Sequence, residues 1–394
     1  MTNSDALMRT YAAPPRTFVR GEGSWLYDAD DVPYLDMLCG LAVTSLGHAR
    51  PEVVQAVSEQ VATLSHLSNL FGNEVGPEVA SLLDELLARA TGHHGRVFFS
   101  NSGAEANECA LKLARRVTTG KHLVVATLDS FHGRTLATLT ATGQPAKHAP
   151  FEPLPTGFTH VSFGDLDQVQ RVLANGDVAA VLVEIIQAEG GVNEAPPGYL
   201  PSLEAACREA GALFMVDEIQ TGLGRTGRWF AFEHEGLAPD VVTIAKALGN
   251  GMPVGACWAR TEVADAFVPG DHGSTFGGQP LAMAAALATL RTMLSIDAPQ
   301  CAQRASEHLV ARLSDLEGVV RIRGKGLLLG VVLDQPVAAA VVSHALSHGL
   351  IINAVRPDVV RFTPPITVSA DEINEAVVRF GASLAEVRSE GAPS

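Results

Sequence analysis

The sequence has few of the features that mark membrane, secreted or nucleic-acid-binding proteins. Its longest apolar runs are strand-sized, well short of the length that spans a bilayer. Residues 1–10 contain no apolar signal core and no Arg-rich amphipathic pattern. Basic residues are in deficit, with 28 Lys and Arg against 43 Asp and Glu, so the formal net charge is -15. This balance argues against nucleic acid and anionic membranes as partners.

Patterns of metal-binding and disulfide-bonded residues are also missing. The five cysteines are scattered and form no CxxC pair, and the 13 histidines contain no HExxH spacing. Neither a metal site nor a disulfide framework is therefore supported. We expect a protein without a metal, in a reducing cytoplasm.

The chain does have enough apolar residues for a large core. Hydrophobic residues make up 47% of its 394 positions, which suggests two or more domains. Strand-like and helix-like segments alternate between about residues 96 and 260, a pattern that predicts an α/β fold with a doubly wound sheet. Residues 51–66 predict an amphipathic helix, and its apolar stripe consists of Val53, Val54, Val57, Val61 and Leu64.

Two strand-like runs in the middle of the chain each end on a charged residue. Residues 213–216 lead to Asp217, and residues 240–245 lead to Lys246. Ligands of open α/β sheets bind at the carboxyl ends of strands, so both side chains could face one pocket. A lysine that is partly desolvated there has a lowered pKa and forms Schiff bases with carbonyl compounds, including pyridoxal phosphate. An acid such as Asp217 could keep that cofactor's ring nitrogen protonated. On spacing alone, a strand-end cap or a solvated loop charge remains the alternative.

Four further segments contain candidate binding residues, each with an ordinary structural alternative. Residues 102–104 lie between a strand and a helix, where N–H groups and the helix dipole favour a phosphate; an ordinary N-cap would look the same. Phe131 and Arg134 could stack on a ring and bind a carboxylate, or lie in a surface loop. Glu189 follows a buried strand, and the alternative for it is a solvated loop glutamate. Arg361 lies on a later strand, and the alternative for it is an exposed charge on an edge strand.

The loop Gly222-Leu-Gly-Arg-Thr-Gly227 matches the GxGxxG fingerprint of dinucleotide-binding proteins. That fingerprint requires a strand before the glycines and a helix directly after them. Here Asp217 to Gln220 separates the strand from the glycines, and no clear helix begins after Gly227. A nicotinamide-dependent dehydrogenase is thus only a remote alternative.

Five specific motifs occur in order along the chain: Ser100-Asn-Ser-Gly-Ala-Glu-Ala-Asn107, Phe131-His-Gly-Arg-Thr135, Val216-Asp-Glu-Ile-Gln-Thr-Gly222, Thr243-Ile-Ala-Lys246 and His272-Gly-Ser-Thr-Phe-Gly-Gly278. Together they resemble those of the pyridoxal-phosphate-dependent class III (ω-) aminotransferases. Three further segments resemble the acetylornithine aminotransferase branch: Gly40-Leu-Ala-Val43, Leu46-Gly-His48 and His66-Leu-Ser-Asn69-Leu.

The resemblance extends from about residue 21 to 387. It implies the fold of type I pyridoxal-phosphate-dependent transferases, with a large cofactor-binding domain at residues 56–295. The small α+β domain would combine residues 1–55 with residues 296–394.

The resemblance implies a role for each residue around the cofactor ring. Lys246 would form the Schiff base with pyridoxal 5'-phosphate, and Asp217 would pair with the pyridine nitrogen. Gln220 would contact the ring hydroxyl. Phe131 would stack on one face of the ring, and Ile219 would pack on the other.

The resemblance also implies how the phosphate is bound. Ser102, Gly103 and Ala104 would bind it, helped by Thr275 from the neighbouring subunit of a homodimer. Two positions depart from the family pattern: Ala104 is often Thr in the family, and Gln279 stands where Asn is usual.

Three charged residues would select the substrates. Arg134 would hold the substrate carboxylate remote from the reacting amine, and Arg361 would bind the α-carboxylate of 2-oxoglutarate. Glu189 would neutralise Arg361 while an ω-amine substrate is bound. Ile185 and Ala188 replace the usual Pro and Gly, which we expect to reshape the loop that carries Glu189.

The implied activity is transfer of the terminal amine of N-acetylornithine to 2-oxoglutarate, giving N-acetylglutamate semialdehyde and glutamate in arginine biosynthesis. Another ω-aminotransferase, using succinyl-diaminopimelate, 4-aminobutyrate or a specialised diamine, is the close alternative. A non-catalytic pyridoxal-binding regulator is a third reading, but no basic helix-turn-helix segment supports it.

Overall fold

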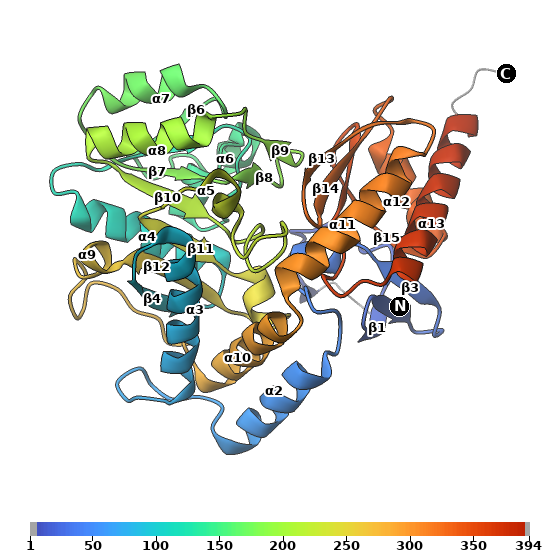
Figure 1. Ribbon diagram of the computed structural model, residues 1–394, viewed down its shortest axis with the longest axis horizontal. Helices are drawn as coiled ribbons and strands as arrows, with labels where there is room; N and C mark the ends of the chain where they lie inside the picture. The colour runs from blue at the N-terminus through green and yellow to red at the C-terminus, as the bar shows by residue number, and fades with distance from the viewer. Residues whose placement is uncertain (1–5, 391–394) are drawn as a thin grey trace.

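A seven-stranded sheet lies at the centre of the larger lobe of the computed structural model, which describes residues 6–390 (Figure 1). Of its seven strands only β12 runs in the opposite direction to the others, so the sheet is mostly parallel, as predicted. In spatial order the strands are β4 (Gly95–Ser100), β12 (Gly255–Arg260), β11 (Val241–Ile244), β10 (Leu213–Asp217), β7 (Val178–Val183), β5 (Leu123–Thr127) and β6 (Phe158–Val161).

Helices cover both faces of this sheet because its strands are apolar on both sides. In β10, Leu213 and Met215 belong to the buried cluster that includes helix α4, whereas Phe214 and Val216 belong to the larger cluster on the other face. Successive strand residues point to opposite faces, so each strand contributes to two cores. The main helices of this lobe are α3 (Val75–Thr91), α4 (Gly103–Val117), α7 (Leu166–Leu173), α8 (Tyr199–Ala210) and α10 (Pro280–Ser295).

The smaller lobe contains an antiparallel four-stranded sheet covered by helices (Figure 1). Its strand order is β13 (Val319–Lys325), β14 (Leu328–Leu333), β17 (Val359–Phe362) and β16 (Asn353–Arg356). Its helices are α11 (Ala298–Ser314), α12 (Ala338–Ser347) and α13 (Ala370–Glu390). Beside it lies a sheet of β1 (Phe18–Glu22), β2 (Trp25–Asp28), β3 (Pro33–Asp36) and β15 (Leu350–Ile351).

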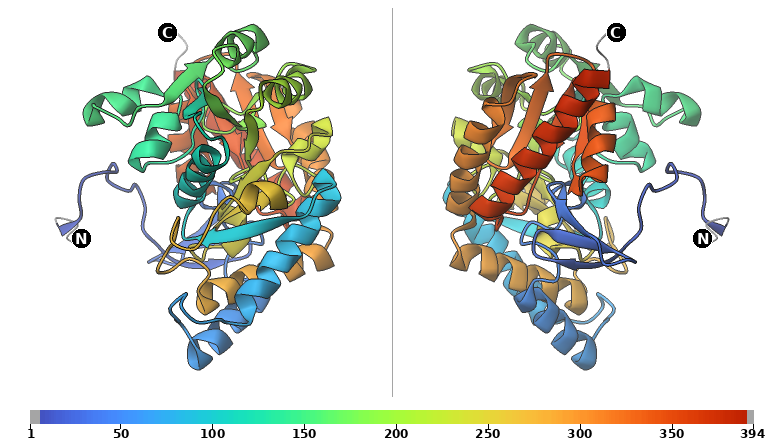
Figure 2. Two further views of the ribbon diagram at one scale, coloured as in Figure 1. Left: turned by 90° about the vertical axis from the view of Figure 1, so that its left-hand side faces the viewer. Right: turned by 90° about the vertical axis from the view of Figure 1, so that its right-hand side faces the viewer.

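The pairing of β3 with β15 brings the first and last parts of the chain into one sheet. The domain limits at residues 55/56 and 295/296 stay a prediction, and the first of them falls inside α2 (Pro51–Thr63). Residues 6–17, before β1, extend away from the body and are exposed (Figure 2).

Helix α2 packs on α10, but its apolar stripe is mostly uncovered (Figure 1). Val53 is buried, whereas Val54, Val61 and Leu64 are 50%, 54% and 40% exposed. The sequence periodicity therefore identified a helix correctly but did not identify what covers its apolar face.

The remaining elements are short and connect the layers. They are α1 (Cys39–Ala42), α5 (Leu136–Ala141), α6 (Pro145–His148), η2 (Ala149–Phe151), β8 (Ile186–Gln187), β9 (Asn193–Glu194), η3 (Ala231–Glu235), η4 (Lys246–Gly249) and α9 (Thr261–Ala264). Within residues 6–390 no single helix is long and apolar enough to cross a membrane. Helices α10 and α11, which are bent by 65° relative to each other, reach the required length and apolar composition only when they are taken together.

Candidate active site

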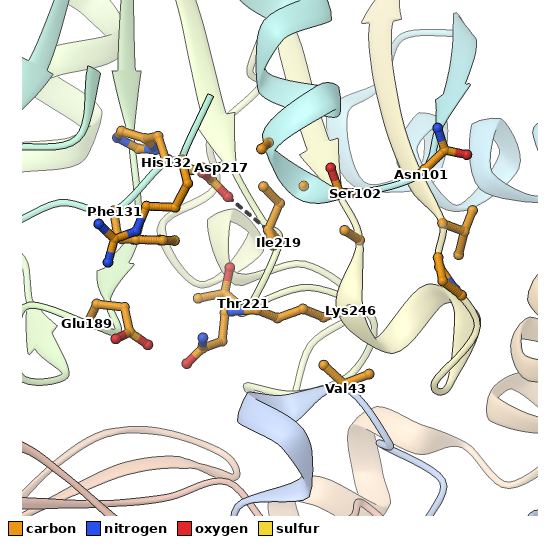
Figure 3. A pocket seen from close by; sticks show the side chains of 18 of the residues that line it. Val43, Asn101, Ser102, Phe131, His132, Glu189, Asp217, Ile219, Thr221 and Lys246 are labelled. Atoms are coloured by element: carbon orange, nitrogen blue, oxygen red, sulfur yellow. Dashed lines mark hydrogen bonds and ion pairs between the residues drawn. The ribbon is translucent and has the colours of Figure 1, made fainter. Parts of the chain in front are cut away.

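A cavity of about 390 Å³ lies at the carboxyl ends of β7, β10 and β11 and at the N-terminus of α4. Asp217 and Lys246 both line it (Figure 3). This position follows from the topology, because β10 and β11 are parallel neighbours and their carboxyl ends lie side by side. The other predicted residues that line the cavity are Ser102, Gly103, Ala104, Phe131, Arg134, Glu189, Ile219 and Gln220.

Lys246 begins the short helix η4 directly after β11, and its side chain extends into the cavity (Figure 3). Its φ of 39° lies in the left-handed region, which is unfavourable for a residue with a Cβ and is typical of functional positions. Burial lowers the pKa of Lys246 to about 8. The charge of Arg361 also lowers this pKa, whereas the nearby carboxylates raise it. About a tenth of the amine is therefore neutral and nucleophilic at pH 7, far more than for a solvated lysine.

Asp217 ends β10 with its carboxylate 4% exposed and almost fully hydrogen-bonded. Its Oδ2 accepts bonds from Asn107 Nδ2 at 2.9 Å and pairs with His132 Nδ1 at 2.8 Å. Its Oδ1 accepts a bond from the Ile219 N–H at 3.0 Å. A carboxylate offers about four lone pairs, so one on Oδ1 remains for a ligand. The site thus presents a fixed negative acceptor to a cationic N–H group.

Four residues that support this arrangement were assigned no role from the sequence. Asn107 and His132 bind Asp217, and Thr243 fixes the Asn107 amide by donating to its Oδ1 at 2.8 Å. Glu184, at the end of β7, accepts the Phe131 N–H at 3.0 Å. Burial, reinforced by the nearby Asp217, raises the pKa of Glu184 well above its usual value. Asn107, His132 and Thr243 lie within three of the five quoted motifs, which was the signal that could have identified them; Glu184 lies in none.

The N-terminus of α4 opens onto the cavity and is a candidate anion site. Ser102 is the N-cap, and its hydroxyl accepts the Glu105 N–H at 3.2 Å. The N–H groups of Gly103 and Ala104 lie in the first turn, where a helix leaves such groups without intrahelical acceptors. Gly103 is needed here because a Cβ would lie 2.7 Å from the Ile219 side chain. The missing side chain thus lets Ile219 lie beside the anion site.

Arg361 is fully buried on β17, between β14 and β16, and is not an exposed edge charge. Its Nη1 donates to Glu189 Oε1 at 2.6 Å, to Gln220 Oε1 at 3.1 Å and to the Ala188 carbonyl at 3.2 Å. Its Nη2 is buried without a partner among the described residues. Burial is the largest influence on the pKa of Glu189 and raises it, but the charge and hydrogen bond of Arg361, with the nearby lysines, together lower this pKa below its usual value. Glu189 is therefore ionised at neutral pH.

Arg361 itself is not among the residues that line the cavity, but Glu189 and Gln220, to which it donates, are. Arg134 does line the cavity, and its guanidinium carbon lies 5.6 Å from the centre of the Phe131 ring. One arginine thus lies in the cavity wall beside an aromatic ring, and the other is buried behind the wall, where an acid neutralises it.

Thr275 does not line this cavity and lies in a separate hollow with Phe98, Asn101 and Phe276. The Thr275 backbone carbonyl accepts a hydrogen bond from Gln279 Nε2 at 3.0 Å. The Oε1 atom of Gln279 accepts a hydrogen bond from the Leu67 N–H at 2.7 Å. Gln279 therefore joins the loop before α10 to the segment after α2.

The Gly222–Gly227 loop lacks the context of a dinucleotide site. After Gly227 the chain enters a short 3-10 helix, η3, and Arg225 is fully buried with its Nη2 on Ser45 Oγ at 2.8 Å. The loop joins the two lobes.

Comparison with known proteins agrees with this geometry. The family model described as Aminotransferase class-III matches residues 7–384. An acetylornithine aminotransferase from Corynebacterium efficiens is 48% identical over 388 residues, covering 97% of this chain and 95% of that protein.

Solved structures give the same result. An ornithine aminotransferase from Toxoplasma gondii matches with a TM-score of 0.91 and 32% identity, over 98% of this chain and 94% of that one. An N-acetylornithine aminotransferase from Stenotrophomonas maltophilia matches with a TM-score of 0.84 and 34% identity, over 98% and 99%. The predicted family and fold type are thereby confirmed: the chain belongs to the class III aminotransferases.

Proposed function

We propose that this aminotransferase moves the terminal amine of N-acetylornithine to 2-oxoglutarate, a step of arginine biosynthesis. The observation that carries the proposal is the ion pair that Glu189, which lines the cavity together with Arg134, makes with the buried Arg361 behind it. Relatives named acetylornithine aminotransferase, 42% to 48% identical over most of their length, support the same choice of substrate.

Pyridoxal phosphate, the cofactor of this family, supplies an aldehyde that condenses with amines and a ring that accepts electrons when a neighbouring carbon loses a proton. The cavity fits it, because an anion site, an acid with a free lone pair, and a buried amine all face one space. We propose that Ser102, Gly103 and Ala104 bind the phosphate. Phe131 and Ile219 would pack on the two faces of the ring.

Asp217 would hold the proton of the pyridine nitrogen through its remaining Oδ1 lone pair. Asn107 and His132 fix the carboxylate for this task, since both bind Oδ2. Lys246 would hold the cofactor through its aldehyde, and when its amine is free its Nζ would take the proton from the substrate carbon that bears the amine. Its lowered pKa suits this work, because a general base is most effective near the operating pH. Gln220 would contact the ring hydroxyl.

The two arginines would let one cavity accept two different substrates. N-acetylornithine reacts at an amine with no carboxylate on the adjacent carbon, so a free Arg361 would be a buried, unpaired charge. Glu189 removes that cost by pairing with it. For 2-oxoglutarate, Glu189 would leave, and Arg361 would bind the α-carboxylate. Arg134 would hold the carboxylate that each substrate carries at its far end.

We further propose a homodimer in which Thr275 contributes to the partner's phosphate site. The loop that bears Thr275 is bonded to the segment after α2 through Asn69 Nδ2, which donates to the Ser274 carbonyl at 2.8 Å. Large apolar side chains on these segments are exposed, which is unusual for a free surface. They are Val54, Val61, Leu64, Leu70, Phe71 and Phe276. Location in the cytoplasm stays a prediction from the sequence.

A panel of amine donors tests the proposal. Purified protein loaded with pyridoxal phosphate is given 2-oxoglutarate and each donor, and glutamate formation is measured. We expect N-acetylornithine to give the highest kcat/KM, above succinyl-diaminopimelate, 4-aminobutyrate and simple diamines. If N-acetylornithine is a poor donor, the protein is another ω-aminotransferase.

A further inference from the structure

Glu189 lies at the tip of a β-hairpin whose backbone is bound to the smaller lobe. Strands β8 and β9 form the hairpin, and residues 188–192 connect them. Three carbonyls of the tip each accept a hydrogen bond from a different arginine: Ala188 from Arg361 Nη1 at 3.2 Å, Gly190 from Arg356 Nε at 2.7 Å, and Gly191 from Arg323 Nε at 2.8 Å. These arginines come from β17, β16 and β13.

A buried side chain anchors the same tip from the other direction. Val192 has a φ of 58° and is fully buried, although a β-branched residue is strained in that region. It packs against the smaller sheet, where a Cβ on Gly324 would lie 2.8 Å from it and a Cβ on Gly330 2.9 Å. The absence of side chains at these two glycines leaves room for the Val192 side chain, and its packing there holds the strained backbone in place.

Arg356 also connects the tip to the larger lobe. Its Nη2 donates to Asp129 Oδ1 at 2.5 Å, in the loop after β5. A Cβ on Gly191 would lie 2.9 Å from Arg356 Cγ and 2.8 Å from Arg323 Nη2, so both side chains lie directly against the tip backbone. Neither arginine is among the residues that line the active-site cavity.

We propose that Arg356 and Arg323 are positioning residues that fix the hairpin tip, so that the Glu189 side chain alone moves between its paired and unpaired states. The inference rests on the proposed function, because it assigns them the enzyme's preference between ω-amine donors and glutamate. The ω-amine donor needs Glu189 paired with Arg361, and glutamate needs Arg361 free.

A more mobile hairpin tip changes the kcat/KM of the ω-amine donor and that of glutamate to different extents. The paired state requires Glu189 Oε1 to lie 2.6 Å from Arg361 Nη1, which a mobile backbone satisfies less often. The unpaired state makes no such demand on the backbone. Loss of one charge-assisted bond to the tip lowers the preference for the ω-amine donor over glutamate by about tenfold.

The test compares two donors on one enzyme form. Holoenzyme with the substitution Arg356→Met or Arg323→Met is mixed with N-acetylornithine or with glutamate. The first half-reaction is followed by the change in cofactor absorbance, and the ratio of the two kcat/KM values is compared with wild type. The matched control is Arg388→Met, since Arg388 makes a comparable ion pair with Asp334 at 2.7 Å, away from the hairpin. A general loss of stability or cofactor lowers both rates and leaves the ratio unchanged.

Hydrogen exchange of holoenzyme peptides covering residues 186–194 supplies a readout independent of turnover. We expect faster exchange there and a ratio about tenfold lower in Arg356→Met and Arg323→Met, with Arg388→Met within twofold of wild type. Unchanged exchange, or faster exchange with an unchanged ratio, overturns the inference. If one variant does not fold, the other decides.

The experiment separates a wrong substrate from a wrong role for Arg356 and Arg323. If wild type rejects N-acetylornithine but accepts another ω-amine, the proposed substrate is wrong, and the ratio is measured with that donor instead. Wild-type protein that accepts no ω-amine donor contradicts both.

Discussion

Replacing Asp217 by Asn removes a charge while nearly preserving shape. Oδ2 receives two donors, from Asn107 and His132, so an amide group facing them would leave both without an acceptor. The cheaper orientation turns the amide nitrogen toward the Oδ1 side, where it faces the Ile219 N–H and the cofactor's ring nitrogen. Either orientation leaves at least one buried donor unsatisfied.

The expected loss of activity is worked out for the orientation of the amide that costs less free energy. An unsatisfied buried N–H costs about 1–3 kcal/mol, and a lost hydrogen bond to a charged group costs a further ~1.5–3 kcal/mol. Their sum, about 2.5–6 kcal/mol, corresponds to a loss of at least about 60-fold, at 1.4 kcal/mol per tenfold. We therefore expect kcat/KM of Asp217→Asn to fall by about 60-fold or more and cofactor affinity to weaken.

The assay is steady-state glutamate formation together with a cofactor titration followed by absorbance. Asp240→Asn is the matched control, because Asp240 accepts the Phe214 N–H at 2.8 Å and pairs with Arg260, outside the cavity. It should lose stability but keep its activity per folded molecule. Activity of Asp217→Asn within tenfold of wild type would refute the role given to the carboxylate.

Three further outcomes are expected. Because burial lowers the pKa of Lys246 to about 8, cofactor loading of apoenzyme should accelerate as pH rises through about 8, with no further rise near 10; stopped-flow absorbance would reveal a midpoint near 10 if the amine were solvated. The raised pKa of Glu184 means that the folded chain keeps a proton that the unfolded chain releases above about pH 4.3, so this residue lowers stability as pH rises. Glu184→Gln should remove that slope in Tm against pH and retain the bond from Phe131 N–H; an unchanged slope contradicts the raised pKa. Gly103→Ala places a Cβ 2.7 Å from Ile219 and should weaken cofactor binding about tenfold, measured by titration, whereas unchanged affinity would mean that Ile219 yields freely.

The sequence predicted those parts of the site that depend on strand order. Asp217 and Lys246 end neighbouring strands, and the carboxyl ends of parallel strands must meet at one edge. The N-terminus of α4 follows from a strand, a small polar loop and a helix in succession. Both inferences need only local patterns and one general rule of α/β sheets.

Contacts between distant segments were not predictable in this way. His132 reaches Asp217 across 85 positions, and no local pattern marks that pairing. Arg361 lies in an apolar four-residue strand, and only the pairing of β17 with strands on both sides shows that its charge is buried. The antiparallel direction of β12 likewise has no signal in its own residues.

Helix α2 illustrates a further limit. Its apolar periodicity shows which residues share a face, but periodicity is the same whether that face is covered by the same chain or by another one. Val53 is buried and Val57 half-buried within this chain, and the exposed remainder of the stripe supports a proposed subunit interface.

The most direct measurement identifies the lysine that carries the cofactor. Holoenzyme is reduced with borohydride, which makes a Schiff base permanent, and is then digested and mapped by mass spectrometry. We expect the cofactor-derived mass on Lys246 alone, and neither the adduct nor turnover in Lys246→Ala. A cofactor found on another lysine, such as Lys112 or Lys147, or turnover that persists in Lys246→Ala, would contradict the active site described for this protein.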